Sequence, residues 1–368
     1  MTGKTLLCLG SGLAPRYKSN TLQALALPLG SHLQFRYEAE LVPEGLHKGL
    51  EDRTLNGTNV LVGYVDCTLG GKQADGRCLI VPYRRAELLD SRKRGSIFIL
   101  TLKLLEFSRA PNLETFQLSL DKNVPRWKLT PQGQPVFDSQ DRPQFEGFWC
   151  HQVSDLQLTV TSDRIGDWQE LATQLRTRED FSTQPYFVLV EGLFRRQEGA
   201  RDGVPVELDD GEYRLQSGKD YELRVIHYDP DSDEHTGGKA TRWLKVDASL
   251  PLLTLRSNPL LAVDSPYDLK SIRFSTGETN RSEYGSLFLH AKDDEEVVPE
   301  LYFAVSVRGD RWKATRNGLI LGILLTATEL VTVLSKGNVE NWQVVTSLCV
   351  LLGLTTGFFV SLGMRKPL

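Results

Sequence analysis

Two long apolar segments near the carboxyl end constrain the architecture of this chain more than any other feature. Residues 318–334 and 343–363 comprise 17 and 21 residues and are separated by a short polar turn. As α-helices they are about 26 and 32 Å long, against a bilayer hydrocarbon core of about 30 Å. Apart from Glu329 neither segment carries a charge, whereas a helix of a water-soluble core has a polar stripe. The pair therefore predicts a transmembrane helical hairpin.

Basic residues on both sides of the hairpin predict its orientation. Six of them flank the two segments: Arg308, Arg311, Lys313, Arg316, Arg365 and Lys366. The connecting turn contains only Lys336. Because positive charge is retained on the cytoplasmic side, we expect a multi-pass protein of the inner (cytoplasmic) membrane with both termini in the cytoplasm. The first apolar run is short and is followed early by Pro15, so we expect no secretory signal peptide.

Small residues recur at four-residue spacing in both segments. Gly318 and Gly322 form such a face on the first segment, and Gly353, Gly357 and Ser361 form one on the second. Faces of this kind let helices approach closely, which predicts a homo-oligomer held through the hairpin. The alternative is chance, because glycine is common in membrane helices.

Glu329 is the most informative single residue of the hairpin. A carboxylate inside a membrane span usually faces a bundle interior, a partner or water. With Thr326 and Thr332 it forms a polar stripe along the first segment. The alternative places Glu329 near the outer interface, where Lys336 is close enough to pair with it.

The remaining chain divides into three regions ahead of the hairpin. About 310 residues precede it, more than one hydrophobic core usually serves. We place a β-rich domain at 1–120, a connecting region at 121–180 and a sandwich-like β domain at 181–310. The formal net charge of −4 argues against a surface built for nucleic acid, so we do not expect nucleic acid as a partner.

Period-two alternation and turn residues indicate a mainly β fold made of antiparallel, sandwich-like domains. Runs such as LQFRYEAEL, at residues 33–41, show this alternation, and residues 84–89 are the one stretch of the first domain that also suits a short helix. No alternation of strands and helices is visible. Gly10-Ser11-Gly12 resembles the start of a dinucleotide-binding fingerprint, but the third glycine is missing and Pro15 interrupts the expected helix, which favours a turn.

One packing helix is expected in the connecting region, over residues 167–178. Asp167 suits the N-cap and Glu170 follows as its capping-box partner. Three apolar residues fall on one face of the helix: Trp168, Leu171 and Leu175. We therefore expect the helix to lie on a sheet.

The sequence lacks the motifs that are typical of a cofactor site, a metal site or a catalytic site. The sequence has no Walker-type loop and no nucleophile elbow, and its six histidines lack metal-ligand spacing. Asp229-Pro-Asp231-Ser-Asp233-Glu234 resembles a calcium loop, but Glu234 replaces the required glycine, so a solvated hairpin loop is favoured. The five cysteines suit free thiols in a reducing compartment. We expect no cofactor, no bound metal and no enzymatic activity.

A basic cluster near residue 90 is the main candidate surface of the first domain. It comprises Arg84, Arg85, Arg92, Lys93 and Arg94, with few acidic residues nearby in the sequence. A solvated face is the simplest interpretation. The alternatives are contact with anionic lipid head groups and binding of a phosphorylated ligand or a nucleic acid.

These features favour a cytosolic sensing or binding protein, anchored to the lipid bilayer, whose hairpin self-associates and perturbs the membrane on activation. A cytosolic ligand or protein of unknown identity is its expected signal. The layout is similar to that of some bacterial antiphage membrane effectors, an analogy of architecture that no motif carries. Two alternatives remain open, namely a passive membrane-tethered scaffold or adaptor, and a membrane-tethered enzyme.

Overall fold

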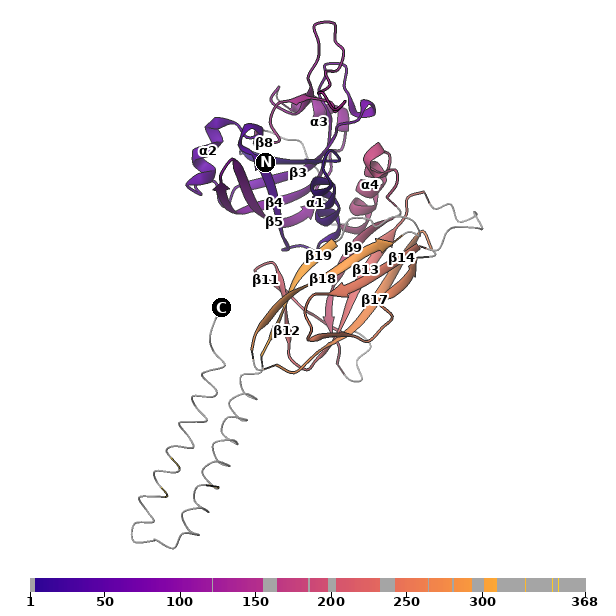
Figure 1. The fold of residues 1–368 in the computed structure, drawn as a ribbon. Helices are drawn as coiled ribbons and strands as arrows, with labels where there is room; N and C mark the ends of the chain where they lie inside the picture. The colour runs from indigo at the N-terminus through magenta and orange to yellow at the C-terminus, as the bar shows by residue number, and fades with distance from the viewer. Residues whose placement is uncertain are drawn as a thin grey trace.

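The computed structural model describes residues 4–120, 122–154, 164–184, 186–197, 203–231, 242–263, 265–279, 281–292 and 301–309, with Thr328, Thr346 and Val350. The structure is mainly β, as the sequence predicts, with 49% strand, 19% helix and four α-helices in the described part. Figure 1 shows one sheet with its helices at the amino-terminal side and two further sheets beside it.

The first sheet is mixed rather than antiparallel. Its strands in spatial order are β2 (His32–Glu38), β5 (Ile97–Phe107), β4 (Leu79–Arg94), β3 (Asn59–Asp66), β1 (Thr5–Ser11) and β8 (Cys150–Val153). β1 and β3 run parallel, with Leu6 opposite Val60 and Ser11 opposite Val65. A parallel pair requires a crossover, and the chain makes it through a helix, contrary to the expectation of a purely antiparallel domain.

The crossover helix is α1 (Pro15–Ala26), and it corrects the interpretation of Pro15. Proline is favoured at the first position of a helix, since the amide hydrogen it lacks has no intrahelical partner there. Pro15 therefore begins the helix instead of interrupting it. The sequence signal is weak because the buried residues of α1, from Thr21 to Ala26, are confined to its second half.

Two shorter helices complete the first domain. α2 (Glu44–Glu51) lies on the sheet: the His47 ring packs on Phe98 with centroids 4.9 Å apart, and the Ser91 hydroxyl donates to the Leu50 carbonyl at 2.6 Å. α3 (Leu113–Ser119) is capped by Asn112, whose side chain accepts the Thr115 amide at 2.9 Å. The short strands β6 (Arg126–Trp127) and β7 (Phe145–Glu146) form a separate two-stranded sheet.

Residues 84–89 belong to β4 and not to a helix. The strand is interrupted by two irregularities in its pairing with β5, one between Arg84 and Ala86 and one between Leu88 and Asp90. Such bulges shift the alternation of side chains, so the sequence of this stretch does not read as a regular strand.

The predicted helix of the connecting region is present as α4 (Arg164–Arg176), followed by the 3₁₀ turn η3 (Glu179–Phe181). Its apolar face is fully buried at the three predicted positions: Trp168, Leu171 and Leu175. The predicted N-cap is wrong, because the helix begins at Arg164 and Asp167 lies in its first turn. Asp167 and Glu170 instead pair with Arg109, at 3.3 and 2.5 Å.

Two further sheets form the carboxyl-terminal part of the described chain, which we call the sandwich. The first contains β10 (Val204–Pro205), β9 (Phe187–Arg195), β13 (Asp220–Tyr228), β17 (Tyr267–Thr276) and β15 (Leu253–Leu255). The second contains β11 (Leu208–Asp209), β12 (Glu212–Gln216), β19 (Leu301–Arg308), β18 (Glu283–Lys292), β14 (Arg242–Ala248) and β16 (Leu260–Val263). β12 and β19 pair in parallel, as far as Gln216 opposite Arg308.

Among the residues that the structure describes, no helix is both long enough and apolar enough to cross a membrane. The two predicted spans, 318–334 and 343–363, lie outside the described residues except for Thr328, Thr346 and Val350.

Candidate functional site

The carboxyl ends of β1 and β3 meet the connecting segment at a polar cluster. In open sheets with parallel strands this edge is where ligands bind, because helix amino termini and strand ends converge there. Here β1 ends at Ser11, α1 begins at Pro15, and β3 ends at Asp66. The turn η3 approaches this edge from the connecting segment, through Asp180.

Asp180 is held against the first domain by two neighbours. The Tyr64 hydroxyl donates a hydrogen bond to the Asp180 carboxylate. A side-chain carbon at Gly12 would lie 2.0 Å from that carboxylate, so only glycine leaves room for it. Burial raises the pKa of Tyr64 above its usual range, and the bond to Asp180 raises it further, so the hydroxyl stays protonated. We call this contact of Gly12, Tyr64 and Asp180 the latch.

Asp66 forms a second polar contact beside the latch. Its side chain is almost fully buried and accepts both the amide and the hydroxyl of Thr68, at 3.0 and 2.6 Å. Arg178, two residues before Asp180, approaches Asp66 at 3.6 Å. Gly71 packs on Asp66 so closely that an added side-chain carbon would lie 2.4 Å from it. The connecting segment is therefore bound to β3 by an ion pair as well as by the latch.

The polar side chains of this cluster bind the connecting segment to the first domain. Across the described ranges, no three His, Cys, Asp or Glu side chains are grouped as a metal site would require. Asp180 belongs to η3, and its carboxylate lies against Gly12 in the loop between β1 and α1, where folds that bind dinucleotides place a phosphate. The chain thus supplies its own carboxylate at that position.

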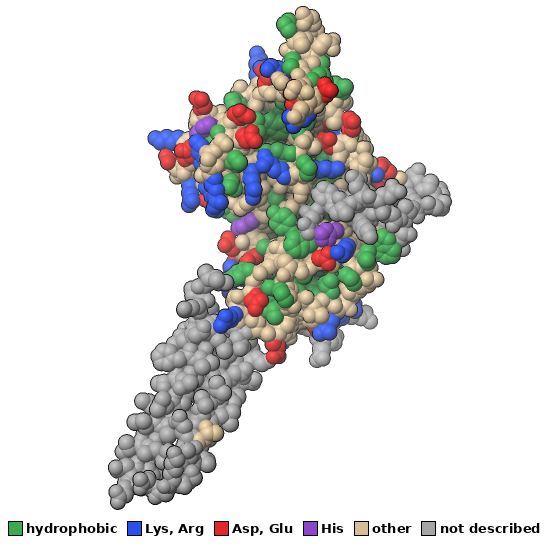
Figure 2. Space-filling view, viewed as in Figure 1, with side chains coloured by type: hydrophobic (Ala, Val, Ile, Leu, Met, Phe, Trp, Pro, Cys, Tyr) green, Lys and Arg blue, Asp and Glu red, His purple; other side chains and the backbone are tan. Residues whose placement is uncertain are grey.

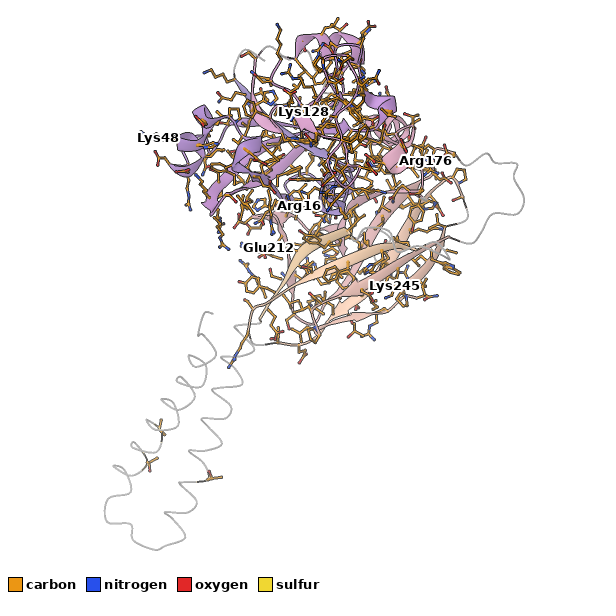
Figure 3. The ribbon with its side chains drawn as sticks, turned by 45° about the horizontal axis from the view of Figure 1, so that its top comes forward. Arg16, Lys48, Lys128, Arg176, Glu212 and Lys245 are labelled. Atoms are coloured by element: carbon orange, nitrogen blue, oxygen red, sulfur yellow. The ribbon has the colours of Figure 1, made fainter. Side chains whose placement is uncertain are left out.

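The other end of the connecting segment binds the sandwich. Arg176, labelled in Figure 3, pairs with Asp231 in the loop after β13. Trp168 packs on Tyr228 with ring centroids 6.0 Å apart, and Thr173 shares a 3.1 Å hydrogen bond with the Tyr228 hydroxyl. Because Asp231 is engaged by Arg176, this part of the acidic run 229–234 acts as a docking loop; residues 232–234 lie outside the described residues.

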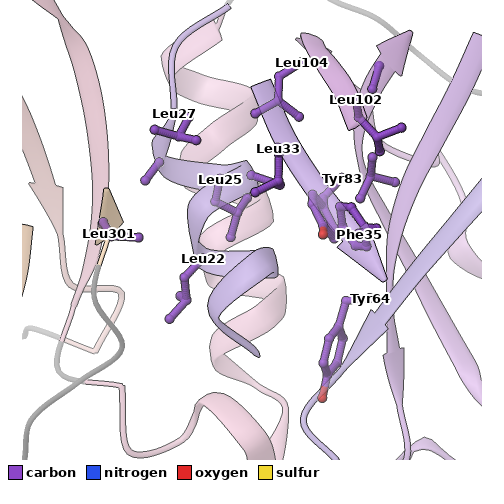
Figure 4. Close-up of a cluster of buried hydrophobic side chains, with 14 of the residues drawn as sticks. Leu22, Leu25, Leu27, Leu33, Phe35, Tyr64, Tyr83, Leu102, Leu104 and Leu301 are labelled. Atoms are coloured by element: carbon purple, nitrogen blue, oxygen red, sulfur yellow. The ribbon is translucent and has the colours of Figure 1, made fainter. Parts of the chain in front are cut away.

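α1 lies between the first sheet and the sandwich and contacts β9 and β19 directly. Figure 4 shows Leu22 and Leu25 of α1 between Leu301 of β19 and the sheet residues Phe35 and Tyr83. Burial of each leucine contributes about 1.5–3 kcal/mol. A cavity with room for about one water molecule remains there, lined by Leu22, Leu25, Gln184, Tyr186, Phe187, Val188 and Leu301. We call this contact of α1 with β9 and β19 the seam.

A second contact between the two domains involves His32 at the start of β2. Its ring packs on Gly211, in the turn between β11 and β12, where an added side-chain carbon would lie 2.3 Å from the ring. Burial lowers the pKa of His32, Asp210 of the same turn raises it, and Lys103 lowers it. Because β12 pairs with β19, this turn is linked through one strand to the end of the described chain.

The predicted basic cluster does not form one charged surface. Arg84 is fully buried, which contradicts its assignment to a surface for an anionic ligand or lipid. The other members are largely neutralised, because Arg85 pairs with Glu106 at 3.8 Å, Arg92 with Asp90 at 3.1 Å and Lys93 with Glu51 at 2.8 Å. Arg94 is exposed at the end of β4. Asp90 lies two residues from Arg92, but Glu51 of α2 and Glu106 of β5 are distant from the cluster in the sequence, so those two pairs are not evident before folding.

The polar stripe of Glu329, Thr326 and Thr332 lies outside the described residues. The same holds for the small-residue faces formed by Gly318, Gly322, Gly353, Gly357 and Ser361.

Sequence reasoning missed the latch and the His32 contact. One available signal was Gly10-Ser11-Gly12 with Pro15 three residues beyond, since proline at a first helical position indicates a strand, loop and helix. Asp180 is more than a hundred residues away from Tyr64 and gives no local signal. Gly211 follows two aspartates and reads as an ordinary turn.

Comparison with known proteins yields no relative. No family matches the sequence, and no curated protein matches it. A Bacteroides ovatus GH5 xyloglucanase in complex with a XXXG heptasaccharide aligns with a TM-score of 0.18 and 9% identity, over 28% of this chain and 19% of its own. The Vibrio cholerae VesB protease aligns with a TM-score of 0.18 and 11% identity, over 61% of this chain and 77% of its own. Similarity at this level bears on neither fold nor function.

The latch yields a direct prediction about stability. Tyr64→Phe removes the hydroxyl that donates to the Asp180 carboxylate, and we expect a loss of about 1.5–3 kcal/mol in the free energy of unfolding. Asp180→Ala should cost a similar amount, and the double variant little more than either, because both changes remove one bond. Chemical denaturation in detergent of the native chain, the two single variants and the double variant measures these free energies of unfolding. Fully additive losses would show that Tyr64 and Asp180 act independently.

Proposed function

We propose that this protein is a membrane-anchored sensing protein, in which a signal received by the first domain reaches a carboxyl-terminal membrane hairpin through the sandwich. The observation that carries the proposal is the direct packing of α1 on β19 at the seam. β19 ends at Arg308, and the first apolar segment begins at Gly318. A linker this short leaves little slack between the strand and the segment that follows.

Three contacts connect the first domain with the sandwich, directly or through the connecting segment. The latch binds the connecting segment to the first domain, the Arg176–Asp231 pair binds it to the sandwich, and the His32–Gly211 contact reaches β12 beside β19. A ligand or protein that displaces any of them changes the position of the sandwich strands relative to the first sheet. Packed interfaces respond to such a change by switching between discrete arrangements.

In this proposal the hairpin associates with hairpins of other copies and perturbs the membrane when the sandwich rearranges. Glu329 with Thr326 and Thr332 lines the interior of the assembled helices, since a carboxylate in a span is stable only against a partner or water. The lipid bilayer is thus the target, and the cytosolic signal is a small ligand or a protein.

The proposal predicts that overexpression of the full chain in bacteria lowers the membrane potential. Glu329→Leu is expected to abolish this effect while the protein stays in the membrane fraction after alkaline extraction. Lys336→Gln is the matched control, because it removes the charge at the turn without touching the stripe. Potential-sensitive dye fluorescence measures the response. A chain that alkaline extraction releases from the membrane, or one in which Glu329→Leu depolarises as strongly as the native chain, would contradict the proposal.

The passive scaffold is the second candidate. It is favoured if the body binds its partner at the membrane and no depolarisation accompanies binding. The same dye measurement separates the two, because a scaffold leaves the membrane potential unchanged whether or not it carries Glu329→Leu.

A further inference from the structure

The two outer faces of the sandwich differ in chemistry. On the sheet of β9, β13 and β17, the outward side chains form a charged network centred on Glu222. Arg224 donates to it at 2.9 Å, Ser271 at 3.1 Å, and Arg273 approaches at 3.8 Å. This is the pattern expected of an antiparallel sheet that has one face in water.

This face also exposes Tyr267 and Leu269 near one end of β17, but aromatic side chains are more numerous on the outer face of the other sheet. Its outward positions on β14, β18 and β19 include four large rings, which we call the aromatic face: Trp243, Tyr284, Phe288 and Tyr302. Phe288 lies directly opposite Tyr302 across the β18–β19 pair. Tyr284 is 71% exposed and Tyr302 46% exposed. Figure 2 shows hydrophobic side chains interspersed with charged and other side chains on the front of this domain. Trp243 and Phe288 are half-buried, and the polar side chains of Lys245, Asp247 and His290 lie between them on the same face. Exposed aromatic side chains are enriched at protein interfaces.

The charges around the aromatic face are balanced. Lys245 lies 2.6 Å from Asp247, and His290 lies 3.5 Å from the same carboxylate. Arg214 of β12 pairs with Asp209 and with Glu212. Figure 3 labels Glu212 and Lys245 on this sheet. Pairing of Lys245 and Arg214 weakens the positive field that a nucleic acid requires and lessens the repulsion between two identical faces.

We propose that the aromatic face is the docking surface for a second copy of this chain, sheet against sheet. The inference rests on the proposed membrane anchoring. β19 carries Tyr302 and ends at Arg308, shortly before the first apolar segment. In two chains anchored in one bilayer, the aromatic faces therefore lie at the same distance from the membrane. A two-fold axis along the membrane normal brings the two faces together in an isologous contact.

The chemistry of the face suits such a contact. Facing sheets pack about 10 Å apart, with interdigitated side chains. Tyrosine supplies large apolar area while its hydroxyl remains hydrated in the monomer, which keeps the unpaired face soluble. Docking of the sandwiches in turn brings the ends of two β19 strands together, and with them the hairpins.

Cross-linking in membranes tests the docking. Tyr302→Cys in the full chain, expressed in bacterial membranes and treated with a short bis-thiol-reactive reagent, is expected to give at least ten times more dimer than Tyr267→Cys. Tyr267 is the matched control, because it is 42% exposed but lies on β17 of the opposite sheet. The native chain gives the background from its own cysteines.

A second pair of variants checks that the cross-link reports on the aromatic face and not on association of the hairpins. Phe288→Glu in the Tyr302→Cys chain should abolish the cross-link, and Leu269→Glu on β17 should leave it intact; thermal melting confirms that both are folded. Equal cross-linking at positions 302 and 267 would overturn the docking, as would a cross-link at 302 that survives Phe288→Glu. Loss of the membrane response in Phe288→Glu without cross-linking at 302 would assign the face to another molecule and also overturn it. If alkaline extraction releases the chain, the proposed anchoring fails instead, which is a separate readout.

Discussion

Replacing Arg84 by methionine is expected to lower the free energy of unfolding by about 3 kcal/mol, because this buried guanidinium joins three elements. Its Nε donates to the Leu105 carbonyl at 2.5 Å, and its Nη1 donates to the Ala24 carbonyl of α1 at 3.0 Å. The guanidinium carbon also lies 4.1 Å from the centre of the Phe107 ring. Methionine retains much of the aliphatic stem but leaves both carbonyls without this donor.

Arg94→Met on the same strand is the matched control. Arg94 is exposed, so its replacement should change the free energy of unfolding by no more than about 0.5 kcal/mol. Chemical denaturation of both variants in detergent, beside the native chain, measures the difference. Similar losses in the two variants would show that Arg84 belongs to a solvated cluster, as the sequence alone suggests.

The second large effect is expected at Gly211, where Gly211→Ala should destabilise the contact between the domains by about 2–4 kcal/mol in total. The residue has a φ of +77°, and its new side-chain carbon would lie 2.3 Å from the His32 ring. Backbone strain and the steric conflict both contribute, so a control must separate them.

Gly57→Ala supplies that control. Gly57 has a φ of +82° but no neighbour within 4 Å, so its replacement should cost only the backbone strain of about 1–2 kcal/mol. Adding His32→Ala to Gly211→Ala should recover the excess, since the ring is then absent. Thermal melting and amide hydrogen exchange at β2 and β12 measure the effect. If His32→Ala recovers nothing, the ring and the turn are not in contact.

Much of the fold follows from local patterns. The alternation of apolar residues predicted the mainly β character, and the spacing of Trp168, Leu171 and Leu175 placed α4 correctly. These two predictions succeeded because burial of one face of a strand or helix sets the spacing of its apolar residues. The bounds of α4 and its cap were missed, because Asp167 pairs with Arg109, which follows β5, instead of capping.

The mixed first sheet was missed for a different reason. Parallel pairing of β1 and β3 depends on a crossover helix, and α1 buries only its second half, so its periodicity is weak. The burial of Arg84 follows from a β-bulge and from two backbone carbonyls, neither of which leaves a mark in the sequence. The latch joins residues that are adjacent only after folding.

The central claim is that the body of this protein acts on the membrane through its own hairpin, and an exchange of the hairpin tests it most directly. Residues 318–363 are replaced by an unrelated two-helix hairpin of equal length, and dye fluorescence follows the membrane potential on overexpression. The account predicts that the native chain depolarises the membrane and that the exchanged chain, though equally resistant to alkaline extraction, does not. Equal depolarisation by both chains, or by neither, would contradict it.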